Sequence, residues 1–348
     1  AAFLALALGR YRYWPARGAA IGAGLGSRAR LVDVVHVLAG GGALSWAVGL
    51  GQPFGAATFS LDPLSASFAF LIAVGGASAS CYAVGYTKHG AGPDGRDGPH
   101  FFFFNLLLFS MYSVVLSRHA LVFLVSWELM TLASFFAILY DDGQGAVRKA
   151  AVTYLVAMQA GALCLLAAFL LLASRTGSFD LEGLTGAGAA SLPLSALFFI
   201  GFAVKAGLVP FHGWLPEAHP AAPSHVSALL SGVMIKTGLY GLFRTVGWLG
   251  LPPEPLCWAL FGLSFAGMLF AIGSALTQRD LKRMLAYSSV ENMGLMGLAF
   301  SLGLLALHWK LSSLAVLALS ACLLHALNHS LFTSLLFLGA GAVYRMTH

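Results

Sequence analysis

Two lysines lie near the middle of consecutive apolar segments, where a charged side chain is costly in a membrane. Lys205 lies within residues 193–210 and Lys236 within residues 221–246. A lysine at the centre of a span costs roughly 2.5–3.5 kcal/mol, so such residues usually pair with a partner or mark an ion pathway. A lysine near the end of a span can instead reach the lipid headgroups. Neither lysine lies near an end, so their positions favour proton or ion movement over this alternative.

A carboxylate and two histidines fall at a similar depth in other apolar segments. Glu128, in SWELMTLASFF, is the only carboxylate deep within a predicted span. His325 and His329 are four residues apart, so they share one face of a helix. Histidine titrates near neutral pH, and a row of titratable groups at one depth suits a proton relay. The alternatives are a structural ion pair at Glu128, and packing or metal binding at the two histidines.

Prolines interrupt the segment that carries Lys205. Pro210 follows the lysine by five residues, and residues 216–223 contain three further prolines. A broken helix leaves backbone groups that only protein or water can satisfy, so a break here would admit water beside Lys205. The alternative is an ordinary loop followed by a helix that is capped at Ser224.

Two further carboxylates lie nearer to segment ends. Glu291 follows the basic stretch QRDLKRMLAYSSV. It is either a peripheral member of the relay or the partner of a nearby cation on Arg279, Lys282 or Arg283. Asp62 precedes Pro63, an arrangement that predicts a helix cap.

The composition indicates a membrane protein. The chain has 348 residues, of which 59% are hydrophobic and 9% charged, and its mean hydropathy is +0.83. Soluble domains carry about 25% charged residues. The net charge of +6 lies in short loops without interleaved aromatic residues, so we expect no nucleic-acid partner. The four cysteines show no metal-ligand spacing, and we expect no catalytic residue, cofactor or metal in this chain.

The predicted architecture is all-α and polytopic, with about ten to eleven transmembrane helices. Residues 1–9 resemble the end of a further helix, and a basic, Gly-rich loop follows over residues 10–30. When loops are assigned alternately to two sides, most Lys and Arg residues fall on the side of that loop, which is therefore predicted to be cytoplasmic. The predicted spans are residues 31–50, 61–86, 101–117, 119–140, 150–174, 193–210, 221–246, 255–276, 284–302 and 311–344.

Four motifs resemble a known family. They are WELMTLASFF, VKAGLVPFHGWLPEAHPAAPSHVSALLSGVMIKTGLYGLFR, QRDLKRMLAYSSVENMG and HALNHSLFTSLLFLGAGAV, and the similarity covers about residues 60–345. These motifs resemble the antiporter-like membrane subunits of complex I (NADH-quinone oxidoreductase), of Mrp antiporters and of membrane-bound hydrogenases. The segments SSVENMG and HALNHSLF are most similar to those of the hydrogenase-4 and formate hydrogenlyase branch.

The resemblance implies a role for each candidate residue. Glu128 and Lys205 would form a switchable pair, Lys236 would be the central bridging group, and His325 and His329 would lead to the exit half. The implied fold has two inverted five-helix repeats, each with one discontinuous helix, here near Pro210. We expect N-terminal helices and loops over residues 1–100, the first repeat over 101–246, and the start of a truncated second repeat over 255–348.

Two features depart from the family pattern. Thr333 stands where the family commonly has a lysine, and the chain ends before the second broken helix. We therefore expect this sequence to be a fragment that lacks the exit half of the relay.

The sequence as a whole predicts proton translocation by a membrane subunit of a redox-driven complex. Such a subunit is not itself catalytic and would have other membrane subunits, a peripheral redox arm and the lipid bilayer as partners, in a prokaryotic inner membrane. The alternatives are an Mrp-type Na⁺/H⁺ antiporter subunit, and a structural subunit that has lost transport.

Overall fold

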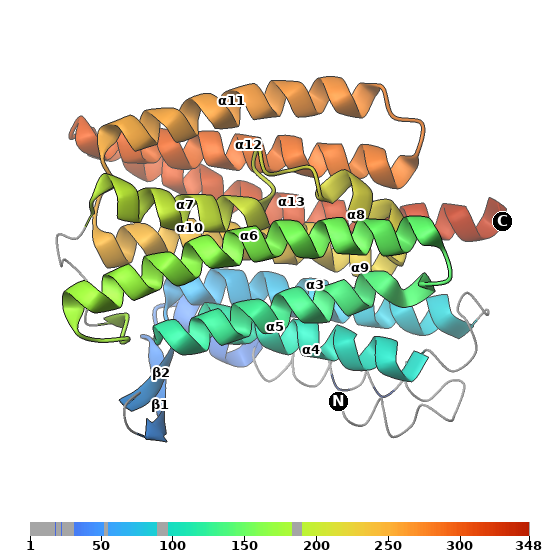
Figure 1. Cartoon of the computed structure of the whole chain (residues 1–348), viewed down its shortest axis with the longest axis horizontal. Helices are drawn as coiled ribbons and strands as arrows, with labels where there is room; N and C mark the ends of the chain where they lie inside the picture. The colour runs from blue at the N-terminus through green and yellow to red at the C-terminus, as the bar shows by residue number, and fades with distance from the viewer. Residues whose placement is uncertain are drawn as a thin grey trace.

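The computed structural model of the chain describes residues 31–51, 55–88, 97–182 and 190–347, with the single residues Gly18 and Gly22. The helix end expected at residues 1–9 and almost all of the basic loop expected at residues 10–30 lie outside the described residues. Within the described part the chain is almost entirely helical, as expected, and the helices run side by side along one direction (Figure 1).

The predicted span over residues 31–50 is wrong. Residues 31–38 are helical, but strand β1 (Leu44–Gly51) follows and pairs antiparallel with strand β2 (Gly55–Leu61). Three consecutive glycines end the helix, and Gly40 and Gly42 have φ values of +90° and +81°, a conformation that favours glycine. Apolar content alone could not reveal this break.

The remaining predicted spans are confirmed as helices. Eight helical segments are long and apolar enough to cross a membrane among the residues that the structure describes, and α7 is a shorter apolar helix. Connections alternate between the two ends of the bundle (Figure 1). The helices are α3 (Pro63–Lys88), α4 (Asp97–Leu116), α5 (Ala120–Ile138), α6 (Gly145–Thr176), α7 (Leu192–Ala206), α8 (Leu215–Ala221), α9 (Ser224–Leu229), α10 (Ile235–Leu249), α11 (Glu254–Leu276), α12 (Leu281–His308) and α13 (Ser312–Thr347).

A π-helical segment joins α9 to α10 and makes them one long helix at the centre of the bundle. The segment is Leu230–Met234, and short π segments occur often at functional sites. In the most apolar window of this helix 94% of residues are buried, against 28% in α11 and 33% in α13. The central helix is therefore enclosed by protein, whereas much of α11 and α13 faces outward with apolar side chains.

Glycines allow the central helix to approach its neighbours closely. A Cβ atom at Gly238 would lie 2.7 Å from both the amide nitrogen of Ala206 and the carbonyl oxygen of Phe202, in α7. A Cβ atom at Gly232 would collide with the Ser334 hydroxyl oxygen, in α13. Because backbone atoms cannot move aside as a flexible side chain can, the contact at Gly238 fixes the separation of α7 and α10.

We expect Gly238→Ala to destabilise the protein by roughly 1–3 kcal/mol, the usual penalty for overpacking a core. The measurement is thermal unfolding in detergent. Gly247→Ala is the matched control, because Gly247 lies on the same helix and a Cβ atom there would have no atom within 4 Å. It should be neutral or slightly stabilising. Equal melting temperatures for the two variants would contradict this account of the packing.

Asp62 forms an ionic cluster at the end of the bundle that carries the hairpin. Its side chain accepts from the backbone amide of Ser65 at 2.8 Å, so the predicted helix cap is confirmed. Its carboxylate also lies 3.1 Å from the Arg118 guanidinium and 2.6 Å from that of Arg244. Although burial raises the pKa of this carboxyl group, the hydrogen bond and charge of Arg244, with the charge of Arg118, lower it to about 2. The group therefore stays ionised across the physiological range.

We expect Asp62→Asn to lower stability at neutral pH by about 1–2 kcal/mol, after allowance for solvent screening of a partly exposed group. A carboxyl whose pKa is lowered by folding stabilises the protein above its unfolded pKa of about 3.9, and this contribution is lost as the pH falls toward 2. The melting temperature of the parent protein should thus approach that of the variant below pH 4. Asp180→Asn is the control. The Asp180 carboxylate also accepts from a backbone amide, that of Glu182, but it forms no ion pair with an arginine among the described residues. A constant difference down to pH 2 would refute the assignment.

Candidate functional site

The helix that carries Lys205 is broken, as the prolines predict. Helix α7 ends at Ala206, and Gly207 follows with a φ of +70°. Helix α8 begins only at Leu215, so residues 207–214, including Pro210, form an irregular connection. The indole of Trp214 donates to the carbonyl oxygen of Val204 at 3.0 Å and satisfies one of the carbonyls at the end of α7.

Lys205 is buried against helix α5. Its Nζ donates to the Thr131 hydroxyl at 2.6 Å and lies 5.1 Å from the centre of the Trp127 ring, a favourable cation–π position. Only 1% of the residue is exposed. Thr131 is not among the residues expected from the sequence, although its position one turn after Glu128 is a signal that could have identified it.

Glu128 lies on the same turn of α5 as these two contacts, but it does not pair with Lys205. The Gln159 amide of α6 donates to the Glu128 carboxylate at 2.8 Å. Within the described part of the chain, no nitrogen–oxygen contact of 4 Å or less joins Glu128 to Lys205. The two groups are thus neighbours across the α5–α7 contact, with Thr131 and Gln159 holding them separately.

Lys236 contacts one of the two predicted histidines directly. Its Nζ lies 2.5 Å from Nδ1 of His329 in α13 and donates to the carbonyl oxygen of Ser231 at 2.5 Å. Both Lys236 and His329 are fully buried. Since the ammonium has no acceptor capacity, a neutral His329 must offer a bare Nδ1 and carry its hydrogen on Nε2. The structure therefore brings together two titratable groups 93 residues apart in the sequence.

His325 and Glu291 are linked through Asn292, a residue that sequence reasoning did not identify. Nε2 of His325 lies 2.9 Å from the Asn292 side-chain oxygen, and the Asn292 amide donates to the Glu291 carboxylate at 2.8 Å. Two of the three cations expected as partners of Glu291 have other contacts: Arg283 pairs with Glu217, and Lys282 donates to the Ala222 carbonyl. Glu291 thus lies beside the histidines rather than in the basic cluster.

The Lys205 and Lys236 groups are separate centres. Between them, the Ser134 hydroxyl lies 2.5 Å from that of Tyr154, which donates to the Met234 sulfur at 3.8 Å. On the Lys205 side, Ser134 donates to the Thr131 carbonyl at 3.0 Å, and Tyr154 interacts with the Thr131 side chain that Lys205 contacts. Among the described residues, no hydrogen bond joins this set to Lys236. Transfer of a proton between the two lysines would therefore require intervening water or a side-chain movement.

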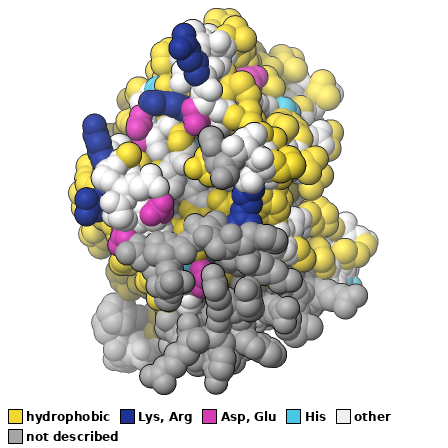
Figure 2. Space-filling model, turned by 90° about the vertical axis from the view of Figure 1, so that its right-hand side faces the viewer, with side chains coloured by type: hydrophobic (Ala, Val, Ile, Leu, Met, Phe, Trp, Pro, Cys, Tyr) yellow, Lys and Arg dark blue, Asp and Glu magenta, His cyan; other side chains and the backbone are white. Residues whose placement is uncertain are grey.

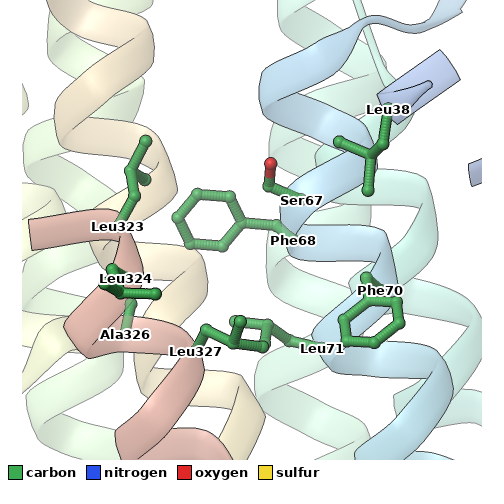
Figure 3. A pocket seen from close by; sticks show the side chains of 9 residues that line it. All are labelled: Leu38, Ser67, Phe68, Phe70, Leu71, Leu323, Leu324, Ala326 and Leu327. Atoms are coloured by element: carbon green, nitrogen blue, oxygen red, sulfur yellow. The ribbon is translucent and has the colours of Figure 1, made fainter. Parts of the chain in front are cut away.

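Several observations concern the alternative that the two histidines bind a metal. The described residues contain no group of three or more His, Cys, Asp or Glu side chains arranged to hold a metal ion. His329 faces the Lys236 ammonium, and His325 is held by Asn292. A cavity of about 420 Å³ between α3 and α13 is lined by apolar side chains except for Ser67, whose hydroxyl donates to the Pro63 carbonyl (Figure 3). It offers aliphatic and aromatic surface and no titratable group.

Comparisons with known proteins agree with the motifs in the sequence. Residues 117–348 match the family described as "NADH:quinone oxidoreductase/Mrp antiporter, TM". Hydrogenase-4 component B of Escherichia coli is 35% identical over 84% of this chain and 44% of its own length. A putative antiporter subunit, mnhA2 of Staphylococcus epidermidis, is 34% identical over 81% of this chain and 36% of its own length. The chain thus spans less than half the length of these relatives.

The fold is also found in a solved respiratory complex. A chain of the archaeal membrane-bound sulfane sulfur reductase superposes with a TM-score of 0.84 and 24% identity, covering 98% of this chain and 68% of that one. The helix lengths and the family match together identify an integral membrane protein. The chain belongs to the NADH:quinone oxidoreductase/Mrp antiporter transmembrane family.

Proposed function

We propose that this chain moves protons as a membrane subunit of a redox-driven complex. The observation that carries the proposal is the contact between Lys236 and His329, which joins two buried titratable groups from different helices. An ammonium that donates to a neutral imidazole can pass its proton to that ring, leaving a neutral amine and an imidazolium. The pair is therefore suited to hold one proton in either of two places.

Lys205 is the proposed switch. A carboxylate that approaches a buried ammonium stabilises its charge, and one that withdraws no longer does so. Glu128 is held by Gln159 in this structure, while Lys205 donates to Thr131. Movement of Glu128 between Gln159 and Lys205 would therefore change how readily Lys205 releases its proton through water toward Lys236.

His325 and His329 are the proposed path beyond Lys236. Their ring centres are 6.4 Å apart on successive turns of α13. His325 contacts Asn292, which donates to Glu291, and these contacts support the proposal that Glu291 is a peripheral member of the relay. The position of Thr333, one turn beyond His329 and 2% exposed, has no titratable group to extend the path along α13.

The relatives support a proposal for the partners and the location. Hydrogenase-4 component B and the chain of the sulfane sulfur reductase belong to assemblies of several subunits by their descriptions, so we infer other membrane subunits and a peripheral redox arm as partners. Basic side chains gather at the end of the bundle shown in Figure 2, which we place in the cytoplasm of a prokaryote by the positive-inside rule. The described ones are Arg148, Lys149, Arg279, Lys282, Arg283 and Arg345.

A second candidate function is Na⁺/H⁺ antiport, favoured by the 34% identity to the putative antiporter subunit. Both functions need the lysines to exchange protons, and they differ in the coupled ion. Proton transport that is unchanged when Na⁺ is replaced by choline would exclude the antiporter, whereas a strict requirement for Na⁺ would favour it.

We expect Lys205→Ala to reduce proton transport at least tenfold, since a positioned proton carrier typically contributes about 10²–10⁴-fold. The measurement is pH change in proteoliposomes that contain the full-length subunit in its complex, with electron transfer followed in parallel. Lys310→Ala is the matched control, because Lys310 is an exposed lysine at the opposite end of the bundle from the described basic side chains named above. Undiminished transport by Lys205→Ala at a normal electron-transfer rate would disprove the proposal.

A further inference from the structure

A second pair of histidines lies outside the relay described above. His100, in the first turn of α4, and His225, in the first turn of α9, approach each other with their Nε2 atoms 2.8 Å apart. The rings are nearly perpendicular, and the residues are 3% and 0% exposed. They lie at the end of the bundle where α4 and α9 begin, the same end as the basic side chains (Figure 1).

The contact requires the two rings to carry their hydrogens on different atoms. One Nε2 must donate and the other must accept, so one neutral ring has a bare Nδ1 and the other has an Nδ1–H group. Both Nδ1 atoms are buried without a hydrogen-bond partner among the described residues. A buried polar atom in this state usually contacts water, and here the two atoms are the outer ends of a short N–H···N chain.

Aromatic rings surround the pair, and charged groups stand around them. His225 lies edge-on to Tyr86, and the ring of His100 lies 4.4 Å from that of Tyr140, centre to centre. Two of the surrounding groups contact these rings: Asp97 of α4 accepts from the Tyr140 hydroxyl at 2.7 Å, and Arg345 of α13 lies over the Tyr86 ring. The titratable and charged groups that face the pair are Tyr86 of α3, Asp97 of α4, Tyr140 after α5, Lys282 of α12 and Arg345 of α13. These side chains exclude bulk water from the two histidines, although the pair lies close to the basic end of the bundle.

Polar side chains of α13 lie along the helix that carries His225, beginning one turn beyond that residue. One turn after His225, the Ser334 hydroxyl donates to the Ala228 carbonyl. Ser334 lines a cavity of about 110 Å³ together with Ser78, Ser330 and apolar side chains that include Leu331 and Leu335. A cavity of this size with several hydroxyl groups can hold water. Ser330 follows His329 in the sequence, but neither His329 nor Lys236 lines this cavity, so a proton would cover the remaining distance through water or a side-chain movement.

We propose that His100 and His225 form the proton entry site that supplies the Lys236–His329 contact from the basic end of the bundle. A proton binds the bare Nδ1 of one ring, the shared hydrogen crosses from Nε2 to Nε2, and the Nδ1 hydrogen of the other ring leaves to water. One proton enters and one leaves, and the rings exchange tautomers. Rotation of the rings restores the starting state before the next proton. This inference rests on the proposed function and adds its point of entry.

The test is His225→Gln and His100→Gln, each in the full-length subunit within its complex in membrane vesicles, with proton uptake measured between pH 6 and 9. The glutamines can hydrogen-bond but cannot relay a proton. We expect uptake to fall about tenfold or more at pH 8 and to become proportional to proton concentration, about tenfold for each pH unit. His308→Gln is the matched control, because His308 contacts the Pro252 carbonyl at the other end of the bundle.

Chemical rescue separates a relay from a structural role. His225→Ala should regain uptake when imidazole is added and should not respond to pyrrole, which has the same size but no basic nitrogen. Membrane levels of each variant are measured by immunoblotting. If the pH profile is that of the parent, or if pyrrole rescues as well as imidazole, the inference is wrong. If Lys205→Ala also transports normally, the proposed function fails; if Lys205→Ala is inactive and His225→Gln is normal, only the entry site fails.

Discussion

The structure depends on satisfying a lysine ammonium inside a bundle of apolar helices. Lys236 has three N–H donors and no water-exposed surface, and it finds acceptors in the Ser231 carbonyl and the His329 ring. In a regular α-helix the Ser231 carbonyl would accept a hydrogen bond from the backbone amide four residues later in the same helix. The π segment Leu230–Met234 alters this pattern of backbone hydrogen bonds beside Lys236, so the local helix geometry and the position of the Lys236 ammonium are coupled. Helix α13 must then lie against this segment to supply the histidine.

The other buried polar contacts have the same form as this one, because each joins side chains of two different helices inside the bundle. Lys205 reaches from α7 to Thr131 on α5, Gln159 from α6 to Glu128, and His325 from α13 to Asn292. Helices in a membrane gain little from burying apolar surface against each other, so close packing and interhelical hydrogen bonds must hold them. Small residues such as Gly238 permit that approach. The same contacts therefore stabilise the bundle and place the titratable groups.

The broken helix illustrates how irregular backbone serves this bundle. After α7, the chain turns at Gly207 and the Trp214 indole satisfies a carbonyl that the helix leaves open. Irregular backbone at depth is tolerated where protein encloses it or a cavity hydrates it. Beyond the break, α8 leads to Ser224 and His225, so one connection places both the end of the Lys205 helix and the start of the helix that carries Lys236.

The sequence by itself determined the membrane class, nearly all the spans, the break after Lys205, and the candidates Glu128, Lys205, Lys236, His325 and His329, because charge and proline are exceptional in apolar segments. It failed at residues 31–50, where glycines outweigh apolar composition. Only the tertiary structure decided the partners. Which helix faces pack against each other across the bundle decides the contacts of Gln159, Thr131 and Asn292 and the contact between His100 and His225. These are ordinary polar residues in sequence, and interhelical packing, which no local pattern encodes, gives them their contacts.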